Sequence, residues 1–396
     1  MSAGATTIES GRSAPATRHP RIRFDRNELS GAFGDIGTDF PLIVGMILAA
    51  HLDPASVLIL FGMMQLFTGL LYGMPMPAQP LKAMAVIVIT QNLAGNILYG
   101  GALAIGIAML LLTATGLIDA LARAVPKTVV RGIQFGLGLQ LAMLALKDYL
   151  PAEGREGYAL GAVCFVLILA LLGNRKVPPG LLAILLGAAF AIFFRAGTGE
   201  VLRGIGIHLP QFHVPVAHDV WIGFLVLALP QIPLSLGNSI LATEQLAKDY
   251  FPEKHVTVRK IGYTYSAMNL INPFFGGVPT CHGSGGIAGH YAFGARTGGS
   301  VILYGSIYLT LGLFFAGSFQ HMVLLFPKPV LGVILLFEAL ALMGLSRDMV
   351  ASVPDFLLVI LVGLMAVTLP YGYVVALVVG TILAYAGKGR LSGLTK

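Results

Sequence analysis

The sequence predicts an all-α polytopic membrane protein that is built from two inverted repeats of seven segments each. Composition is the first reason, because 56% of the 396 residues are hydrophobic and only 11% are charged, against about 25% charged residues in a typical soluble domain. The spacing of the apolar segments and a set of matches between the two halves are the other reasons. We therefore expect an integral multi-pass protein with most of its chain in the lipid bilayer.

Most of the predicted segments are long enough to cross a hydrocarbon core that is roughly 30 Å thick. They lie at 31–50, 54–72, 98–118, 126–146, 157–173, 179–195, 219–243, 258–275, 299–317, 327–345, 353–369 and 372–387. Two shorter segments, 76–92 and 278–295, are predicted to be half-helices: each begins with a short, extended, proline-bounded polar lead-in and continues as a short apolar helix. The fourteen segments divide into a first repeat at 27–195, a linker at 196–216 and a second repeat at 217–388.

Matching proline positions indicate that the two halves are related. Pro77 and Pro279 open the two short segments and are 202 residues apart. Pro126 and Pro327 open two long segments at a separation of 201 residues, and the proline-containing starts of the last segment in each half match at an offset of 192. Three co-linear matches at similar offsets favour a duplication. Because each repeat has an odd number of segments, the second must be inverted in the membrane.

The basic residues predict how the chain is oriented. Of the 25 Lys and Arg residues, nineteen fall on the side of the N-terminus, five on the opposite side and one, Lys82, within a segment. This asymmetry places both termini in the cytoplasm, so we expect a cell (inner) membrane protein with a disordered cytoplasmic tail at 1–26 and a short one at 389–396. An Arg- and Ser-bearing start also fits an organelle transit peptide. Loop charges account for the net charge of +7, and no nucleic-acid partner is expected.

The two short segments predict a substrate site, because interrupted segments in matching positions of two halves mark the binding site of many transporters. A helix that begins inside a membrane exposes N–H groups without intrahelical partners, and an anion satisfies them. Glycines permit a close approach of backbone to ligand, and polar side chains add donors. The residues concerned are Gln79 in the first short segment and Thr280, His282, Gly283, Ser284, Gly285, Gly286 and Gly289 in the second.

The second short segment, 278–295, allows other interpretations. Helix packing is an alternative role for Gly286 and Gly289. A dinucleotide-binding loop would need a surrounding βαβ unit, and a metal site would need more ligands than the adjacent Cys281 and His282. We therefore expect neither a cofactor nor a metal. The two cysteines, Cys164 and Cys281, do not support a disulfide framework.

Charged residues within the segments are further candidates, since a charge inside a bilayer is costly and usually functional. Lys82 would supply positive potential beside the first short helix, unless its side chain reaches the membrane interface. Asp35 and Asp39 stand one helical turn apart, and we expect them to pair with Lys82 or with backbone groups rather than to carry a coupling proton. Glu338 and Asp355 are predicted to be buried acids, either proton sites or satisfied polar contacts.

The eighth segment carries a polar stripe that also belongs to the predicted site. Gln231, Ser235, Asn238 and Ser239 follow two prolines that open a helix. Their amides and hydroxyls are neutral donors, which suit an anion that is already fully deprotonated.

Four stretches together resemble the molybdate transporter family that is related to the sulfate permeases. They are GAFGDIGTDFPLIVGM, YGMPMPAQPLKAMA, PQIPLSLGNSI and FGGVPTCHGSGGIAGHYAFGART, and they are distributed through most of the chain. The resemblance implies the seven-plus-seven inverted-repeat fold shared with sulfate permeases and nucleobase transporters, in which a core domain moves against a gate domain. It also implies that molybdate, a tetrahedral dianion, is held between the third and tenth helix starts.

Carried onto this chain, the resemblance implies a set of anion contacts: Gln79, Lys82, Gln231, Thr280, Cys281, His282, Gly283, Ser284 and Gly285. Two departures from the wider sulfate-permease pattern matter. The sequence ends soon after its last segment, so no cytoplasmic regulatory domain is expected, and Gln231 stands where many relatives carry an acid. The coupling ion, a proton or sodium, is therefore left open, as is a homodimeric state.

The expected function is secondary active transport of a tetrahedral oxyanion, molybdate before sulfate. A proton-coupled carrier of nucleobases or organic anions on the same fold is an alternative, but it would need an acid that reads base N–H groups, and Gln231 argues against it. A channel would need a continuous polar pore, and a membrane-embedded enzyme would need a nucleophile with its base; the sequence presents neither. We therefore expect a transporter and not an enzyme, with lipid and a small oxyanion as partners.

Overall fold

The computed structural model describes residues 22–118, 120, 124–174, 177–194 and 204–387. Residues 1–21 of the predicted N-terminal tail, 196–203 of the predicted linker and the predicted tail at 389–396 lie outside this part of the chain. Within the described residues the regular structure is helical, apart from one two-stranded sheet.

The first half of the chain contains α1 (Arg26–Ala32), α2 (Ile36–Ala50), α3 (Pro54–Tyr72), β1 (Ala78–Pro80), α4 (Lys82–Gln91), α5 (Gly95–Thr115), α7 (Lys127–Leu144) with the π-helical turn η1 (Ala145–Tyr149), α8 (Gly154–Leu171) and α9 (Pro179–Phe194). The second half contains α11 (Ala217–Gly223), η2 (Phe224–Ala228), α12 (Leu229–Leu234), η3 (Ser235–Leu241), α13 (Ala242–Tyr250), α14 (Val258–Ile271), η4 (Asn272–Phe275), β2 (Thr280–His282), α15 (Ser284–Ala292), α16 (Gly299–Leu325), α17 (Lys328–Gly344), η5 (Leu345–Met349), α18 (Val353–Thr368) and α19 (Gly372–Gly387).

The boundaries of α3 show how local sequence sets these elements. Asp53 accepts a hydrogen bond from Ser56 N–H at 2.9 Å, and Pro54 occupies the first helical position, where an N–H would have no intrahelical partner anyway. The helix ends at Gly73, whose φ of 59° is a left-handed conformation that glycine adopts without steric cost. The segment predicted at 54–72 is confirmed.

Seven of the described helical stretches are long and apolar enough to cross a membrane, and α1 with α2 makes an eighth if the two are counted together. These two helices meet at an angle of 42°, where Gly34 packs directly against the backbone of Gly289. Four more apolar helices, α4, α9, α18 and α19, have 10–17 residues. The mostly helical, membrane-type architecture predicted from the sequence is therefore confirmed.

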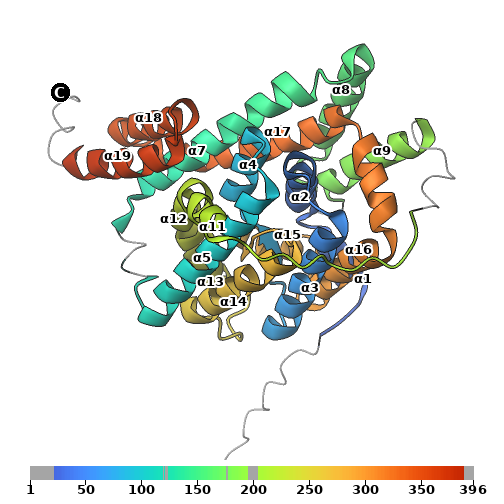
Figure 1. The fold of residues 1–396 in the computed structure, drawn as a ribbon, viewed down its shortest axis with the longest axis horizontal. Helices are drawn as coiled ribbons and strands as arrows, with labels where there is room; N and C mark the ends of the chain where they lie inside the picture. The colour runs from blue at the N-terminus through green and yellow to red at the C-terminus, as the bar shows by residue number, and fades with distance from the viewer. Residues whose placement is uncertain (1–21, 119, 121–123, 175–176, 195–203, 388–396) are drawn as a thin grey trace, which may run out of the picture.

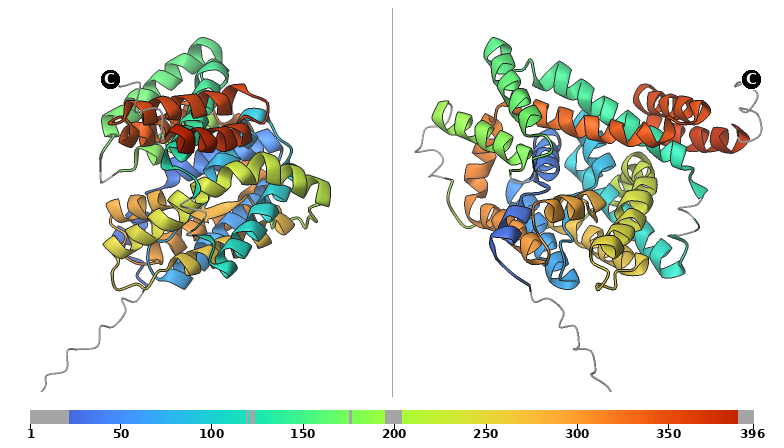
Figure 2. Two further views of the ribbon diagram at one scale, coloured as in Figure 1. Left: turned by 90° about the vertical axis from the view of Figure 1, so that its left-hand side faces the viewer. Right: turned by 180° about the vertical axis from the view of Figure 1, so that it is seen from behind.

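The helices pack as two groups. The first group comprises α1–α5 and α11–α16, and the second group comprises α7–α9 and α17–α19. Figure 1 shows the second group along the top of the view, with α17, α18 and α19 packed against α7. Figure 2 shows from two further sides that the first group lies beneath it. Each group takes helices from both halves of the chain.

The short helix α4 lies at the boundary between the two groups. It has ten residues, too few to cross a bilayer at about 1.5 Å per residue. Ala83 to Val88 are fully buried, and α4 packs on α2, α7 and α12. A helix can begin in the middle of such a molecule because protein, rather than lipid, surrounds its polar end.

Candidate functional site

Strands β1 and β2 pair antiparallel and bring the two predicted short segments together. Gln79 lies opposite Cys281 in this ladder, and Leu81 N–H donates to Pro279 O at 3.0 Å. Helices α4 and α15 begin directly after their strands. The pairing therefore sets the starts of two helices at one place, although they are far apart in the sequence.

Each strand is held by a buried amide side chain from the helix that precedes it. Gln65 of α3 donates to Ala78 O at 2.6 Å and accepts from Ala78 N–H at 2.9 Å. Asn269 of α14 donates to Thr280 O at 2.6 Å and accepts from Thr280 N–H at 3.0 Å. These bonds satisfy backbone groups that would be costly to bury alone. The two halves thus use the same device to position an extended lead-in.

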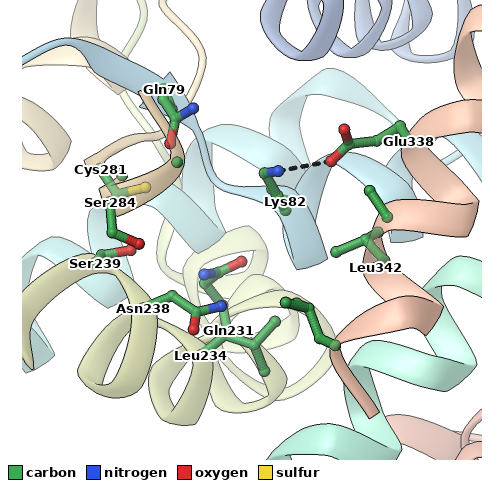
Figure 3. A pocket seen from close by; sticks show the side chains of 14 residues that line it. Gln79, Lys82, Gln231, Leu234, Asn238, Ser239, Cys281, Ser284, Glu338 and Leu342 are labelled. Atoms are coloured by element: carbon green, nitrogen blue, oxygen red, sulfur yellow. Dashed lines mark hydrogen bonds and ion pairs between the residues drawn. The ribbon is translucent and has the colours of Figure 1, made fainter. Parts of the chain in front are cut away.

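A cavity of about 200 Å³ lies at the starts of α4 and α15, between the two helical groups. Its walls are Gln79, Lys82, Gln231, Leu234, Asn238, Ser239, Cys281, Gly283, Ser284, Gly285, Glu338, Ala341, Leu342 and Leu345. Figure 3 shows the polar side chains of the first group on one side and α17 on the other, with Glu338 reaching across to Lys82. The polar lining therefore comes from the first group, apart from Glu338.

The start of α15 offers backbone donors to this cavity. Gly283 is the N-cap residue and has no side chain with which to cap the helix, so the N–H groups from Ser284 onward lack intrahelical acceptors. Ile287 N–H is the first to find one, at Gly283 O. A Cβ on Gly285 would meet nothing within 4 Å, which leaves the backbone open to a ligand. With the positive end of the helix dipole, this arrangement favours an anion.

The start of α4 differs, because the side chain of Gln231 already occupies it. Gln231 Oε1 accepts hydrogen bonds from the N–H groups of Ala83 at 2.9 Å and Met84 at 3.3 Å, and its Nε2 donates to Ser235 Oγ at 3.1 Å. The sequence led us to expect two open helix starts at the anion site. That expectation is corrected here: α4 is capped by a neutral side chain, and α15 is the open one of the two.

We expect the Gln231→Leu variant to be less stable than the parent protein, because two buried N–H groups would lose their acceptor at a cost of about 1–3 kcal/mol. Thermal unfolding of purified protein in detergent would measure this loss as a lower midpoint temperature. Gln231→Glu is the matched control, since it retains an acceptor at the same position. A leucine variant with the parent's midpoint would show that this cap contributes nothing.

Lys82, the first residue of α4, directs its ammonium group into the cavity. Lys82 Nζ lies 2.6 Å from Glu338 Oε1 of α17, and the side chains are 32% and 7% exposed. Glu338 Oε2 accepts a hydrogen bond from Thr38 Oγ1 at 3.2 Å. The lysine therefore does not extend to an interface. It forms its ion pair with an acid from the other helical group, and not with Asp35 or Asp39, which was one of the two pairings that the sequence led us to expect for these aspartates.

Asp35 and Asp39 lie behind the cavity wall. Asp35 Oδ2 accepts a hydrogen bond from Gln79 Nε2 and so orients a side chain that lines the cavity. Asp39 is fully buried, and its Oδ2 accepts from the Tyr304 hydroxyl at 3.4 Å. These contacts favour the supporting role for both acids. Asp355, which was predicted to be buried, is exposed in the first turn of α18, so that prediction was wrong.

The pleat of β2 turns Thr280 and His282 away from the cavity, because alternate side chains of a strand point to opposite faces. Thr280 Oγ1 accepts from Asn272 Nδ2 at 3.2 Å, and His282 Nε2 lies 2.6 Å from Thr264 Oγ1. Cys281, between them, lines the cavity. Thr280 and His282 therefore hold the strand in place, and we remove them from the set of candidate ligand contacts.

The glycines of the second short segment serve two purposes. A Cβ on Gly286 would overlap Pro77, and one on Gly289 would overlap the backbone of Gly34, so these two permit close packing. A Cβ on Gly283 would overlap the amide of Gln79, although its φ of −108° is available to any residue. Gly285 is the one whose missing side chain leaves open space toward the cavity.

Sequence reasoning missed the apolar wall that α17 contributes. Ala341 and Leu342 of α17 and Leu345, the first residue of η5, line the cavity together with Glu338. They follow this acid by three, four and seven residues, which places all four on one face of a helix. That spacing was the signal that could have identified them once Glu338 was assigned to the site.

Solved structures share the fold of this chain. The transmembrane domain of a cyanobacterium bicarbonate transporter, BicA, is similar with a TM-score of 0.63 and 17% identity, covering 92% of this chain and 98% of that chain. SLC26A9 is similar with a TM-score of 0.69 and 12% identity, covering 91% of this chain and 64% of that one. The chain therefore has the fold of a polytopic membrane transporter.

Sequence comparison then gives the family. The family model described as a molybdate transporter of the MFS superfamily matches residues 27–141 and 223–342. Molybdate transporter 2 of Arabidopsis thaliana is 34% identical over 382 residues, which cover 84% of this chain and 82% of that protein. The chain belongs to the molybdate transporter family, as its motifs predicted. It is accordingly a member of a family of membrane transporters, not of enzymes.

Proposed function

We propose that this protein is a secondary active transporter that moves a tetrahedral oxyanion, molybdate before sulfate, across the membrane by alternating access. The observation that carries the proposal is the cavity between the two helical groups. It combines the uncapped start of α15 with the ammonium group of Lys82. Backbone N–H groups and one lysine can hold a dianion without proton transfer.

The proposed anion contacts are those predicted residues that line the cavity. Gly283, Ser284 and Gly285 would supply the backbone cradle, and Lys82 the positive charge. The remaining contacts would be Gln79, Gln231, Cys281, Asn238 and Ser239, all of which line the cavity. An anion there would touch both helical groups, because Glu338 and Leu342 form the opposite wall. A shift of one group against the other would then change the side from which the cavity opens.

We further propose that the protein has fourteen membrane segments in two inverted repeats. It would lie in the cell (inner) membrane with both termini in the cytoplasm. The matching pairs of amide hydrogen bonds, from Gln65 to Ala78 and from Asn269 to Thr280, support the proposal that the two halves are repeats. The asymmetry of the basic residues supports the orientation. A homodimer and a co-transported proton or sodium ion stay proposals that rest on the family resemblance.

The test is uptake of labelled molybdate at nanomolar concentration by cells that express the protein, with and without excess sulfate. We expect uptake above that of cells with an empty vector, and only weak competition by sulfate in large excess. Equal competition by the two anions would make the protein a general oxyanion carrier. Uptake equal to the vector control, with the protein present in the membrane, would contradict the proposed function.

A further inference from the structure

Glu338 is an acid in a place where an anion is proposed to bind. It belongs to α17 of the second helical group, yet its Oε1 lies 2.6 Å from Nζ of Lys82 on α4 of the first group. The same carboxylate is 7% exposed and lines the proposed anion cavity. Lys82 is the one Lys or Arg residue among the residues that line this cavity. Its charge is therefore neutralised from within the protein.

A dianion could not use Lys82 while this ion pair is intact. A second negative group within a few ångströms of a carboxylate raises the energy of both when little water separates them. Binding of a dianion therefore requires the carboxylate of Glu338 to leave the lysine.

The structure contains a place for the displaced carboxylate. A second cavity of about 200 Å³ adjoins Glu338 on its other side, with Thr38, Gly34, Gly37 and Gly180 among its lining residues. Glu338 lines both cavities. Its second oxygen, Oε2, already accepts a hydrogen bond from Thr38 Oγ1 at 3.2 Å. The side chain can therefore turn toward the second cavity and keep one of its two partners.

We propose that Glu338 is an internal competitor of the transported dianion, which holds Lys82 when the site is empty and turns toward Thr38 when the dianion binds. This inference rests on the proposed function of the cavity. When the site is empty, the ion pair ties α17 to α4 and so links the two helical groups. When the anion takes the lysine, that link is released. Occupancy of the site is thereby communicated to the second group through one side chain.

The test compares molybdate binding to the purified parent protein and to Glu338→Gln, which removes the charge but retains the size of the side chain. We expect the dissociation constant to fall at least tenfold, because the competitor for Lys82 is weakened. A residue that merely supports the fold would give weaker binding when changed. Glu244→Gln is the matched control, since it removes one acid that is paired with Lys248 on the surface helix α13; its binding should equal the parent's.

A second variant tests the other half of the proposal. Thr38→Val removes the hydroxyl that would be the one remaining partner of the displaced carboxylate. This hydrogen bond is stronger once the carboxylate has lost Lys82, so molybdate binding should weaken by a few-fold. A dissociation constant for Glu338→Gln that is equal to or higher than the parent's would overturn the competitor role. An unchanged dissociation constant for Thr38→Val would show that the displaced carboxylate does not move toward the second cavity. If the parent protein bound no molybdate at all, the proposed function itself would fail, which is a distinguishable outcome.

Discussion

Replacing Gly285 with valine is expected to abolish molybdate binding while the protein stays folded. A Cβ at this position meets no protein atom within 4 Å, so the branched side chain would extend into the cavity and cover the N–H groups at the start of α15. Molybdate-dependent thermal stabilisation of the purified protein is the measurement, because it reports binding separately from transport. We expect the stabilisation to disappear for Gly285→Val and to shrink for Gly285→Ala.

The control for this prediction is a glycine with equally open surroundings outside the cavity wall. A Cβ on Gly344 also meets nothing within 4 Å, so Gly344→Ala should retain the full shift. Ser284→Ala removes one hydroxyl and should cost about 0.5–1.5 kcal/mol, which is a few-fold to roughly tenfold in affinity. If the Gly285 variants kept the shift and Ser284→Ala lost it, side chains and not the backbone would bind the anion.

Replacing Lys82 with alanine is expected to raise the dissociation constant for molybdate by tenfold or more, or about 1.4 kcal/mol. The cavity would then keep the negative charge of Glu338 without its counter-charge, so the variant should also unfold at a lower temperature. Arginine should rescue binding poorly, because its planar group needs more room than an ammonium. Titration of purified protein with molybdate measures the first effect, and thermal unfolding measures the second.

A double variant separates the two effects of losing Lys82. In Lys82→Ala with Glu338→Gln, neither charge remains, so the midpoint of unfolding should recover toward the parent's value. Binding should stay weak, because nothing replaces the positive charge. A single Lys82→Ala variant with normal affinity would show that the start of α15 binds the anion without help from the lysine.

Much of the fold could be predicted because local sequence determines it. Apolar length and proline positions located the ends of several helices to within a few residues, as for α3 and α18, although α16 continues to Leu325, beyond the predicted end at 317. The two short segments stood out because a polar, proline-bounded start inside an apolar stretch has few structural explanations. Their pairing through β1 and β2 was not predictable in register, since three-residue strands have too little pattern to align.

The partners of the buried polar groups were the part that the sequence could not supply. Lys82 was recognised as unusual, but its partner Glu338 is 256 residues away, and any of several acids would have satisfied the same electrostatic argument. Thr280 and His282 were placed at the site because their side chains can donate hydrogen bonds. The pleat of strand β2 turns them to the opposite face, and the face that each residue of an extended lead-in presents could not be predicted without its pairing to β1.

The joining of β1 to β2 has a consequence for how the protein is made. A ribosome that adds about 5–20 residues per second needs roughly 10–40 s to proceed from the first strand to the second. For most of this interval α4 is without the cap that Gln231 supplies, and throughout it β1 has no partner strand. We expect a truncated chain that ends at residue 195 to be degraded rapidly. Co-expression of the remaining part as a separate chain should restore its lifetime. If the truncated chain had the same lifetime as the full protein, the bilayer alone would be enough to stabilise α4 without its cap.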